Sequence, residues 1–160
     1  MIRELNLSDA EFILELVNTP GWIRFIGDRQ IRDSYAAGHY IVNGPLKSYA
    51  QHSFGLYAMQ MKDSSELAGL CGILKRDSLE HPDLGFALLP AFEGRGLVHE
   101  AATAILSHAQ QHQNVKQVLA ITLEDNVRSV SLLERLGFTY EKKILIGEEE
   151  LLLFSFIINP

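Results

Sequence analysis

The sequence has little cysteine, few cationic residues and no long apolar run. Its single cysteine, Cys71, excludes an intramolecular disulfide framework and a cysteine-rich zinc site. The 14 Lys and Arg residues are outnumbered by 20 Asp and Glu, and the net charge of −6 disfavours binding to a nucleic-acid backbone. No apolar stretch approaches the roughly 18 residues of a membrane-spanning helix, and the N-terminal segment has no signal-peptide core. These absences predict a cytoplasmic protein that binds neither nucleic acid nor a membrane.

What the sequence does contain is sufficient for one well-packed domain. Hydrophobic residues make up 47% of the 160 residues and charged residues 21%, a composition typical of globular proteins rather than disordered chains. No repeat, low-complexity tract or linker rich in Pro, Gly or Ser divides the chain. We therefore expect a single domain over residues 1–160.

Apolar periodicity and turn residues predict the N-terminal elements. A strand is expected over 2–7, followed by a helix that Ser8 caps with Glu11 three residues later. The triplet Thr19-Pro20-Gly21 should end this helix, and a second helix is expected over 28–42.

The rest of the chain is predicted to be rich in strands. Six more strands are expected, over 54–61, 67–75, 83–89, 115–122, 139–146 and 150–158. A long helix should run from a glycine loop to about Asn114, and a shorter one over 126–136. This order predicts an α+β fold whose mixed sheet contains a strand–helix–strand crossover.

The glycine-rich turn Gly94-Arg95-Gly96 separates a predicted strand from the long predicted helix. The first N–H groups of a helix have no carbonyl partners, and glycines let an anion approach the backbone. The turn therefore predicts a phosphate site, although it also suits a tight connection that binds nothing. No Gly-Lys-Ser/Thr ends the loop, which excludes a P-loop. Its position past mid-chain excludes a Rossmann fingerprint.

Two blocks of sequence, in order, resemble the motifs of a known superfamily. The stretch DLGFALLPAFEGRGLVHEA, residues 83–101, is similar to the acetyl-CoA-binding motif of the GNAT N-acetyltransferases. Its closest match is the RimJ/RimL branch, the ribosomal-protein N-acetyltransferases. The second block, NVRSVSLLERLGF, follows at residues 126–138. The resemblance implies a three-layer arrangement, with a mostly antiparallel sheet of about six or seven strands and helices on both faces.

The resemblance also implies which residues hold acetyl-CoA. The backbone amides from Gly94 to His99 and the Arg95 side chain would hold the pyrophosphate, and the pantetheine arm would lie along the preceding strand. Asn126 resembles the residue that hydrogen-bonds this arm, and it also reads as a helix N-cap. The family usually has Gln or Arg at the position of Glu93 and Gly or Ala at that of Val98. The expected cofactor-binding set is Phe86, Ala87, Leu88, Glu93, Gly94, Arg95, Gly96, Leu97, Val98, His99, Asn126 and Ser129.

Glu93 is the departure with an electrostatic consequence. A carboxylate beside a pyrophosphate lowers affinity unless it points away, whereas Val98 would contribute through its backbone N–H.

Catalytic roles follow from the same resemblance. Asp83 lies roughly where several relatives have an acidic residue, and the alternative is a solvated carboxylate at a strand start. Other candidates for the base that deprotonates the amine are Glu66, Glu80 and His52. Many relatives have a tyrosine where this chain has Leu133, so Ser129, the hydroxyl used by the RimJ/RimL branch, is expected to protonate the departing thiolate. A helix residue without chemistry is its alternative.

The acceptor is expected to be a primary amine, either a protein N-terminus or a small molecule, acetylated by direct transfer in a ternary complex. The aromatic residues expected on the acceptor side are Trp22, Phe25, Tyr35 and Tyr40. The protein is expected to be a monomer or a homodimer. One alternative is a non-catalytic module of the same fold that senses acyl-CoA, and a weaker one is a structural domain whose loop binds nothing.

No metal is expected. His108 and His112 share a helix at i,i+4, but no third ligand stands at a characteristic spacing, so they are interpreted as packing residues. Cys71 is interpreted as a small buried residue rather than a nucleophile.

Overall fold

The computed structural model describes residues 1–112 and 114–158 and contains one seven-stranded sheet. The strands are β1 (Ile2–Glu4), β2 (Leu56–Gln60), β3 (Leu67–Leu74), β4 (Asp83–Leu88), β5 (Gln117–Thr122), β6 (Thr139–Ile146) and β7 (Glu149–Ile157). The α-helices are α1 (Ala10–Val17), α2 (Pro20–Phe25), α3 (Ser34–Ile41), α4 (Lys47–His52), α5 (Leu97–His112) and α6 (Val127–Leu136). Short helical turns are η1 (Leu7–Asp9), η2 (Val42–Leu46) and η3 (Pro90–Phe92).

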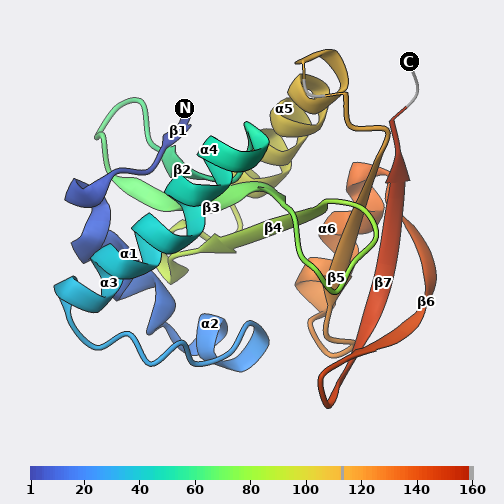
Figure 1. Ribbon diagram of the computed structural model, residues 1–160, viewed down its shortest axis with the longest axis horizontal. Coiled ribbons are helices and arrows are strands. Elements are labelled where there is room, and N and C mark those ends of the chain that lie inside the picture. Colours follow the sequence, from blue (N-terminus) through green and yellow to red (C-terminus); the bar gives the residue numbers. More distant parts are fainter. Residues whose placement is uncertain (113, 159–160) are drawn as a thin grey trace.

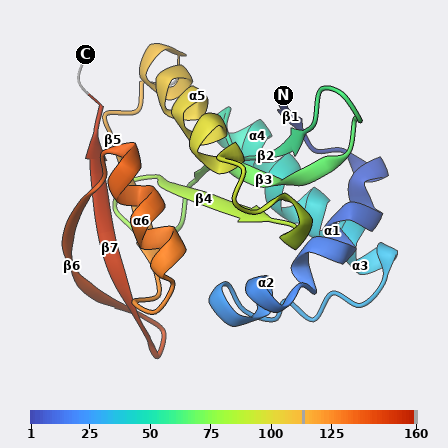
Figure 2. The same ribbon diagram turned by 180° about the vertical axis from the view of Figure 1, so that it is seen from behind.

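The sheet order is β1-β2-β3-β4-β5-β7-β6, and every pairing is antiparallel except that of β4 with β5. Helix α5 makes the crossover between these two parallel strands. In Figure 1, α3 and α4 lie in front of the sheet while α5 and α6 lie behind it, and Figure 2 shows the reverse. The predicted α+β class, with a mostly antiparallel sheet and helices on both faces, is confirmed.

The predicted cap of the first helix is wrong by two residues. The Asn6 side chain accepts a hydrogen bond from the Ser8 N–H at 2.9 Å, and the Asp9 carboxylate accepts one from the Asn6 N–H at 2.9 Å. Arg3 binds both oxygens of Asp9, each at 2.9 Å. The Asp9 carboxylate thus completes the capping box two residues earlier than Glu11 would, and β1 ends at Glu4.

The triplet at residues 19–21 starts a helix as well as ending one. Thr19 accepts a hydrogen bond from the Trp22 N–H at 3.4 Å, and Pro20 occupies the first turn of α2, where its missing N–H is not needed. The predicted end of the first helix is confirmed, but the sequence does not predict α2.

The predicted helix over 28–42 forms only in its second half. Asp33 accepts from the Ala36 N–H at 2.8 Å and starts α3, whereas Asp28 is used in a turn, accepting from the Gln30 N–H at 2.8 Å. The predicted helix end at residue 42 is also wrong, because η2 is a π-helical turn that includes Pro45 and continues into α4.

The C-terminal half follows the predicted order. Gly137 ends α6 with a φ of +96°, and the β6–β7 hairpin turns at Gly147 with a φ of +62°. Strand β6 has the predicted bounds, β5 begins two residues later than predicted, and β7 begins and ends one residue earlier. Fully buried apolar side chains from the helices and the sheet form the core, among them Leu16, Ile41, Leu70, Ile73, Val118, Leu133 and Phe154.

Candidate active site

The parallel strands β4 and β5 pair only where Asp83 lies opposite Leu119, with the Leu119 N–H donating to the Pro82 carbonyl at 2.8 Å. Beyond this point the two strands run apart, as both views show (Figures 1 and 2). The loop 93–96 leads from the β4 side into α5, and the turn 123–126 leads from β5 into α6. Two helix N-termini therefore flank the divergence of the strands, the place where open α/β sheets bind ligands.

The glycine loop has the backbone geometry of an anion site. Gly94 and Gly96 have φ angles of +75° and +74°, and nothing lies within 4 Å of where a Cβ would stand on either. The Glu100 N–H donates to the Gly96 carbonyl at 3.1 Å, which leaves the N–H groups of Leu97 to His99 without helical acceptors. Together with the helix dipole, these groups favour a bound anion.

Three side chains of the loop region have distinct places. The Arg95 guanidinium lies over the Phe92 ring, 5.5 Å from its centroid. Val98 is only 6% exposed and packs into the core, so only its backbone can face a ligand. The Glu93 carboxylate pairs with Arg128 of α6 at 2.5 Å between Oε2 and Nη1.

The free edge of β4 supplies backbone groups to the same region. The Leu89 N–H donates to Ala68 on the β3 side at 2.8 Å, and the Pro82 carbonyl accepts on the β5 side. Because backbone groups alternate between the two edges of a strand, the N–H groups of Phe86 and Leu88 point to the β5 side. The pairing with β5 has ended there, so these groups and the half-buried Ala87 adjoin the divergence.

The first turn of α6 brings Asn126 and Ser129 to the other side. The Asn126 side-chain oxygen accepts from the Ser129 N–H at 3.3 Å, which confirms its role as N-cap and leaves its amide N–H₂ to donate elsewhere. Ser129 is 8% exposed, and its hydroxyl has no hydrogen-bond partner among the described residues. Leu133 is fully buried and offers no hydroxyl.

Asp83 is buried and ion-paired. It is 0% exposed, and the Arg76 Nε lies 3.0 Å from each carboxylate oxygen. Burial raises the pKa of Asp83 above its ordinary value, and the charge of Arg76 partly opposes this shift. The alternative of a solvated carboxylate is therefore wrong. Asp83 lies at the start of β4, at the opposite end of the strand from the glycine loop.

Helix α2 carries two of the predicted acceptor residues to the turn before α6. Arg24 pairs with Asp125 at 3.0 Å, and its guanidinium lies 4.6 Å from the centroid of the Phe25 ring. Trp22 is 6% exposed, and its indole N–H has no partner among the described residues. Helix α2, which the sequence does not predict, thus carries the predicted acceptor residues Trp22 and Phe25.

The two predicted tyrosines lie in different surroundings. Tyr40 is partly buried; burial raises its pKa, and the positive charges of Arg29 and Arg76 oppose the shift. Tyr35 is 77% exposed and contacts the ring of His39 edge-on at 4.5 Å. No described contact joins Tyr35 to the other three aromatic residues.

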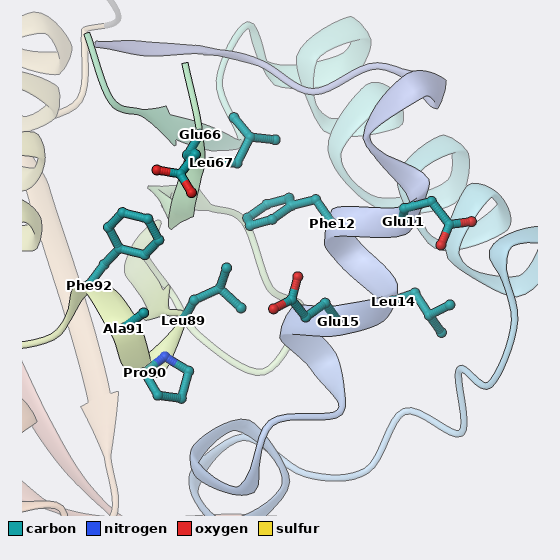
Figure 3. Close-up of a pocket in the computed structure, with 10 residues that line it drawn as sticks. All are labelled: Glu11, Phe12, Leu14, Glu15, Glu66, Leu67, Leu89, Pro90, Ala91 and Phe92. Carbon is teal, nitrogen blue, oxygen red and sulfur yellow. The ribbon is translucent and has the colours of Figure 1, made fainter. Parts of the chain in front are cut away.

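The remaining candidates for the base are dispersed. His52 ends α4 and stacks on Phe54 at 5.5 Å, and Glu80 is exposed between β3 and β4. Glu66 is also exposed, just before β3, and lines a groove of about 870 Å³ between α1 and the end of β4 (Figure 3). The rest of the lining is Glu11, Phe12, Leu14, Glu15, Leu67, Leu89, Pro90, Ala91 and Phe92. The sequence alone does not indicate this groove, because its walls come from segments far apart in the chain.

Among the described residues, no group of three or more His, Cys, Asp or Glu side chains could hold a metal ion. The side chain of His112 lies outside the described part of the chain. Cys71 is fully buried, as expected, and burial raises the pKa of its thiol to about 12. Over the described ranges no helix is long and apolar enough to cross a membrane.

Comparison with known proteins agrees with this geometry. Residues 1–139 match the family described as acetyltransferase (GNAT) domain. The chain is 33% identical over 101 residues to the ribosomal protein uS5-alanine N-acetyltransferase of Escherichia coli, covering 63% of this chain and 52% of that enzyme. It therefore spans about half the length of that curated relative. The likeness to YdaF of Bacillus subtilis, a putative ribosomal N-acetyltransferase, is 26% over 91% of this chain and 81% of that protein.

The fold has close counterparts among solved structures. The structure of RimL, a ribosomal α-N-protein acetyltransferase in complex with coenzyme A, superimposes with a TM-score of 0.83 at 15% identity. The match covers 98% of this chain and 93% of that one. The resemblance to the RimJ/RimL branch that the sequence motifs indicated is confirmed.

Proposed function

The chain belongs to the acetyltransferase (GNAT) family, and we propose that it transfers an acetyl group from acetyl-CoA to a primary amine by direct transfer in a ternary complex. The observation that carries this proposal is the glycine loop at the start of α5, which opens beside the unpaired edge of β4. The glycine loop suits phosphates, and the free edge of β4 suits an extended arm that contains amide groups. Acetyl-CoA has both a diphosphate and such an arm. The relatives named as N-acetyltransferases support the same activity.

In this proposal the chain holds acetyl-CoA from three sides. The N–H groups from Gly94 to His99 and the Arg95 side chain bind the pyrophosphate, as the free helix N-terminus favours. The edge of β4 at Phe86, Ala87 and Leu88 pairs with the pantetheine arm. The amide of Asn126 donates to the arm from the opposite side.

When bound, acetyl-CoA supplies an acetyl thioester, and the amine nitrogen forms a bond to its carbonyl carbon while the bond to sulfur breaks. Asp83 takes the proton that the amine must lose. A backbone N–H on the free edge of β4 donates to the carbonyl oxygen as it gains negative charge. Ser129 donates a proton to the departing sulfur, and its unpartnered hydroxyl on the first turn of α6 suits this role.

The acceptor approaches from the side of α2 and α3. Trp22 and Phe25 lie on α2, which the Arg24–Asp125 ion pair joins to the turn before α6, and Tyr40 lies on α3. The acceptor class is a protein N-terminal amine or a small-molecule amine, and the relatives that act on ribosomal proteins favour the first.

A second candidate is an acyl-CoA sensor of the same fold. It is favoured by one observation: the position where many relatives have a catalytic tyrosine is occupied by the buried Leu133.

The test is calorimetric titration of acetyl-CoA, followed by turnover assays on peptides with free N-termini and on small amines. Gly94→Val should abolish binding, because a side chain there strains a backbone at φ +75° and obstructs the phosphate. Gly147→Val is the matched control, because Gly147 has a φ of +62° and open space around it but lies in the turn between β6 and β7. Wild-type binding without turnover on any amine would favour the sensor, and absence of binding to the folded wild type would refute both functions.

A further inference from the structure

An ion pair joins the loop before α5 to the first turn of α6, across the divergence of β4 and β5. Glu93 precedes α5, Arg128 lies in the first turn of α6, and their charged atoms are 2.5 Å apart. Both side chains are accessible, with exposed fractions of 42% and 78%. Arg128 has no other ion pair or side-chain hydrogen bond within the described part of the chain.

The position of Arg128 is not explained by the stability of its own helix. A cation in the first turn of a helix opposes the helix dipole, so Arg128 is unfavourably placed for α6. The dipole of α5 favours the Glu93 carboxylate beside its free N–H groups, and the carboxylate there occupies the surroundings that a ligand anion would use. The positions of both residues are explained if a ligand anion replaces the Glu93 carboxylate as the partner of Arg128.

We propose that Arg128 is a binding residue for the diphosphate of acetyl-CoA, and that Glu93 holds its guanidinium over the site until the diphosphate displaces the carboxylate. This inference rests on the proposed function. It adds a cation from α6 to the Arg95 guanidinium on the α5 side, so that the diphosphate lies between the two loops. Glu93 then acts as an internal competitor for the same cation.

The two charges have separable effects on affinity. Glu93→Gln removes the competitor and should tighten acetyl-CoA binding about two- to fivefold, the range of an exposed ion pair. Arg128→Gln should weaken binding about tenfold, because a charge-assisted contact to phosphate is lost. The loss should persist when Arg128→Gln is added to Glu93→Gln, since the cation then acts on the ligand and no longer on Glu93.

The experiment is a calorimetric double-mutant cycle on the full chain with acetyl-CoA, repeated with dephospho-CoA and with acetyl-pantetheine. Dephospho-CoA retains the diphosphate and should show the same dependence on Arg128. Acetyl-pantetheine lacks all phosphates, and its KM in turnover should not change. Lys143→Gln is the matched control, because Lys143 is also an exposed cation paired near α6, with Glu124 at 3.2 Å. It should leave every affinity unchanged.

Three results would overturn the inference while leaving acetyl-CoA binding established. One is an Arg128→Gln loss that vanishes in the Glu93→Gln background, which would mean that Arg128 only neutralises Glu93. The second is an equal loss for Lys143→Gln, which would mean a general charge effect. The third is a loss that disappears with dephospho-CoA, which would assign Arg128 to the 3′-phosphate. If the wild type binds no acetyl-CoA, the proposed function fails as well.

Discussion

At the scale of single residues, Asp83 and Arg76 combine a buried carboxylate with one cationic partner. Burial raises the pKa of Asp83, so the protonated form persists above the ordinary value of about 3.9. A base must be deprotonated, and kcat/KM should therefore rise with pH through this raised pKa. Arg76→Gln removes the charge that opposes the shift, and the rising limb should move to higher pH. The measurement is the pH profile of kcat/KM for wild type and variant on the same amine.

Asp83→Asn distinguishes catalysis from structure at this site. If Asp83 is the base, kcat should fall about 100-fold or more and the rising limb assigned to Asp83 should disappear. Because burial disfavours the charged form, the wild type loses folding stability as the pH rises through the raised pKa of Asp83. Asn does not titrate, so the stability of Asp83→Asn relative to wild type should be greater at neutral pH than at pH 4. An unchanged limb in both variants would show that the pair is structural.

At the scale of elements, Asn126 has two functions that one substitution can separate. Its side-chain oxygen caps α6, and its amide N–H₂ is proposed to donate to the pantetheine arm. Asn126→Ser keeps an equally good cap, so the free energy of unfolding should change little while acetyl-CoA affinity falls about tenfold. Asn126→Ala should lose the affinity and also about 1 kcal/mol of stability. Urea unfolding and calorimetry measure the two effects, and equal affinity for wild type and Asn126→Ser would contradict the proposed contact.

Elements were predictable from sequence where local signals agreed with tertiary packing. Helix α6 has a cap at Asn126 and a terminal glycine at Gly137, and both act as the residue types predict. The elements of the N-terminal third were harder to predict, because several residues there are suitable helix caps. Asn6 and Ser8 are both good caps, and the choice was made by Arg3, which holds Asp9 in the position that completes the box with Asn6. The contact between Arg3 and Asp9 depends on how β1 and η1 are placed in the fold, and no local sequence pattern predicts it.

The same distinction applies to the candidate site. Family motifs located the glycine loop, the β4 edge and the first turn of α6, because these are continuous stretches of sequence. They could not predict the ion pairs Arg76–Asp83, Arg24–Asp125 and Arg128–Glu93, since each pair joins different elements. Nor could they locate the groove between α1 and the end of β4.

At the scale of the whole molecule, the strand divergence divides the sheet into two parts that acetyl-CoA would bridge. The strands β1 to β4 lie on one side and β5, β7 and β6 on the other, with a single backbone pairing between β4 and β5. A ligand that binds the folded state at 100 times its Kd stabilises it by about 2.7 kcal/mol. For a chain of this size that should raise Tm by about 5–10 °C.

Hydrogen exchange shows whether this stabilisation comes from bridging. The amides of Phe86 and Leu88 point to the β5 side beyond the last strand pairing, so they should exchange quickly in the free protein and slowly with acetyl-CoA. Adenosine 3′,5′-diphosphate, which lacks the pantetheine arm, should protect the loop 93–99 but leave these two amides unprotected. Protection of Phe86 and Leu88 by both ligands would point to a general tightening of the fold, and protection by neither would contradict a pantetheine arm along β4. Only protection confined to acetyl-CoA places the arm in the divergence, where the amine must reach the thioester.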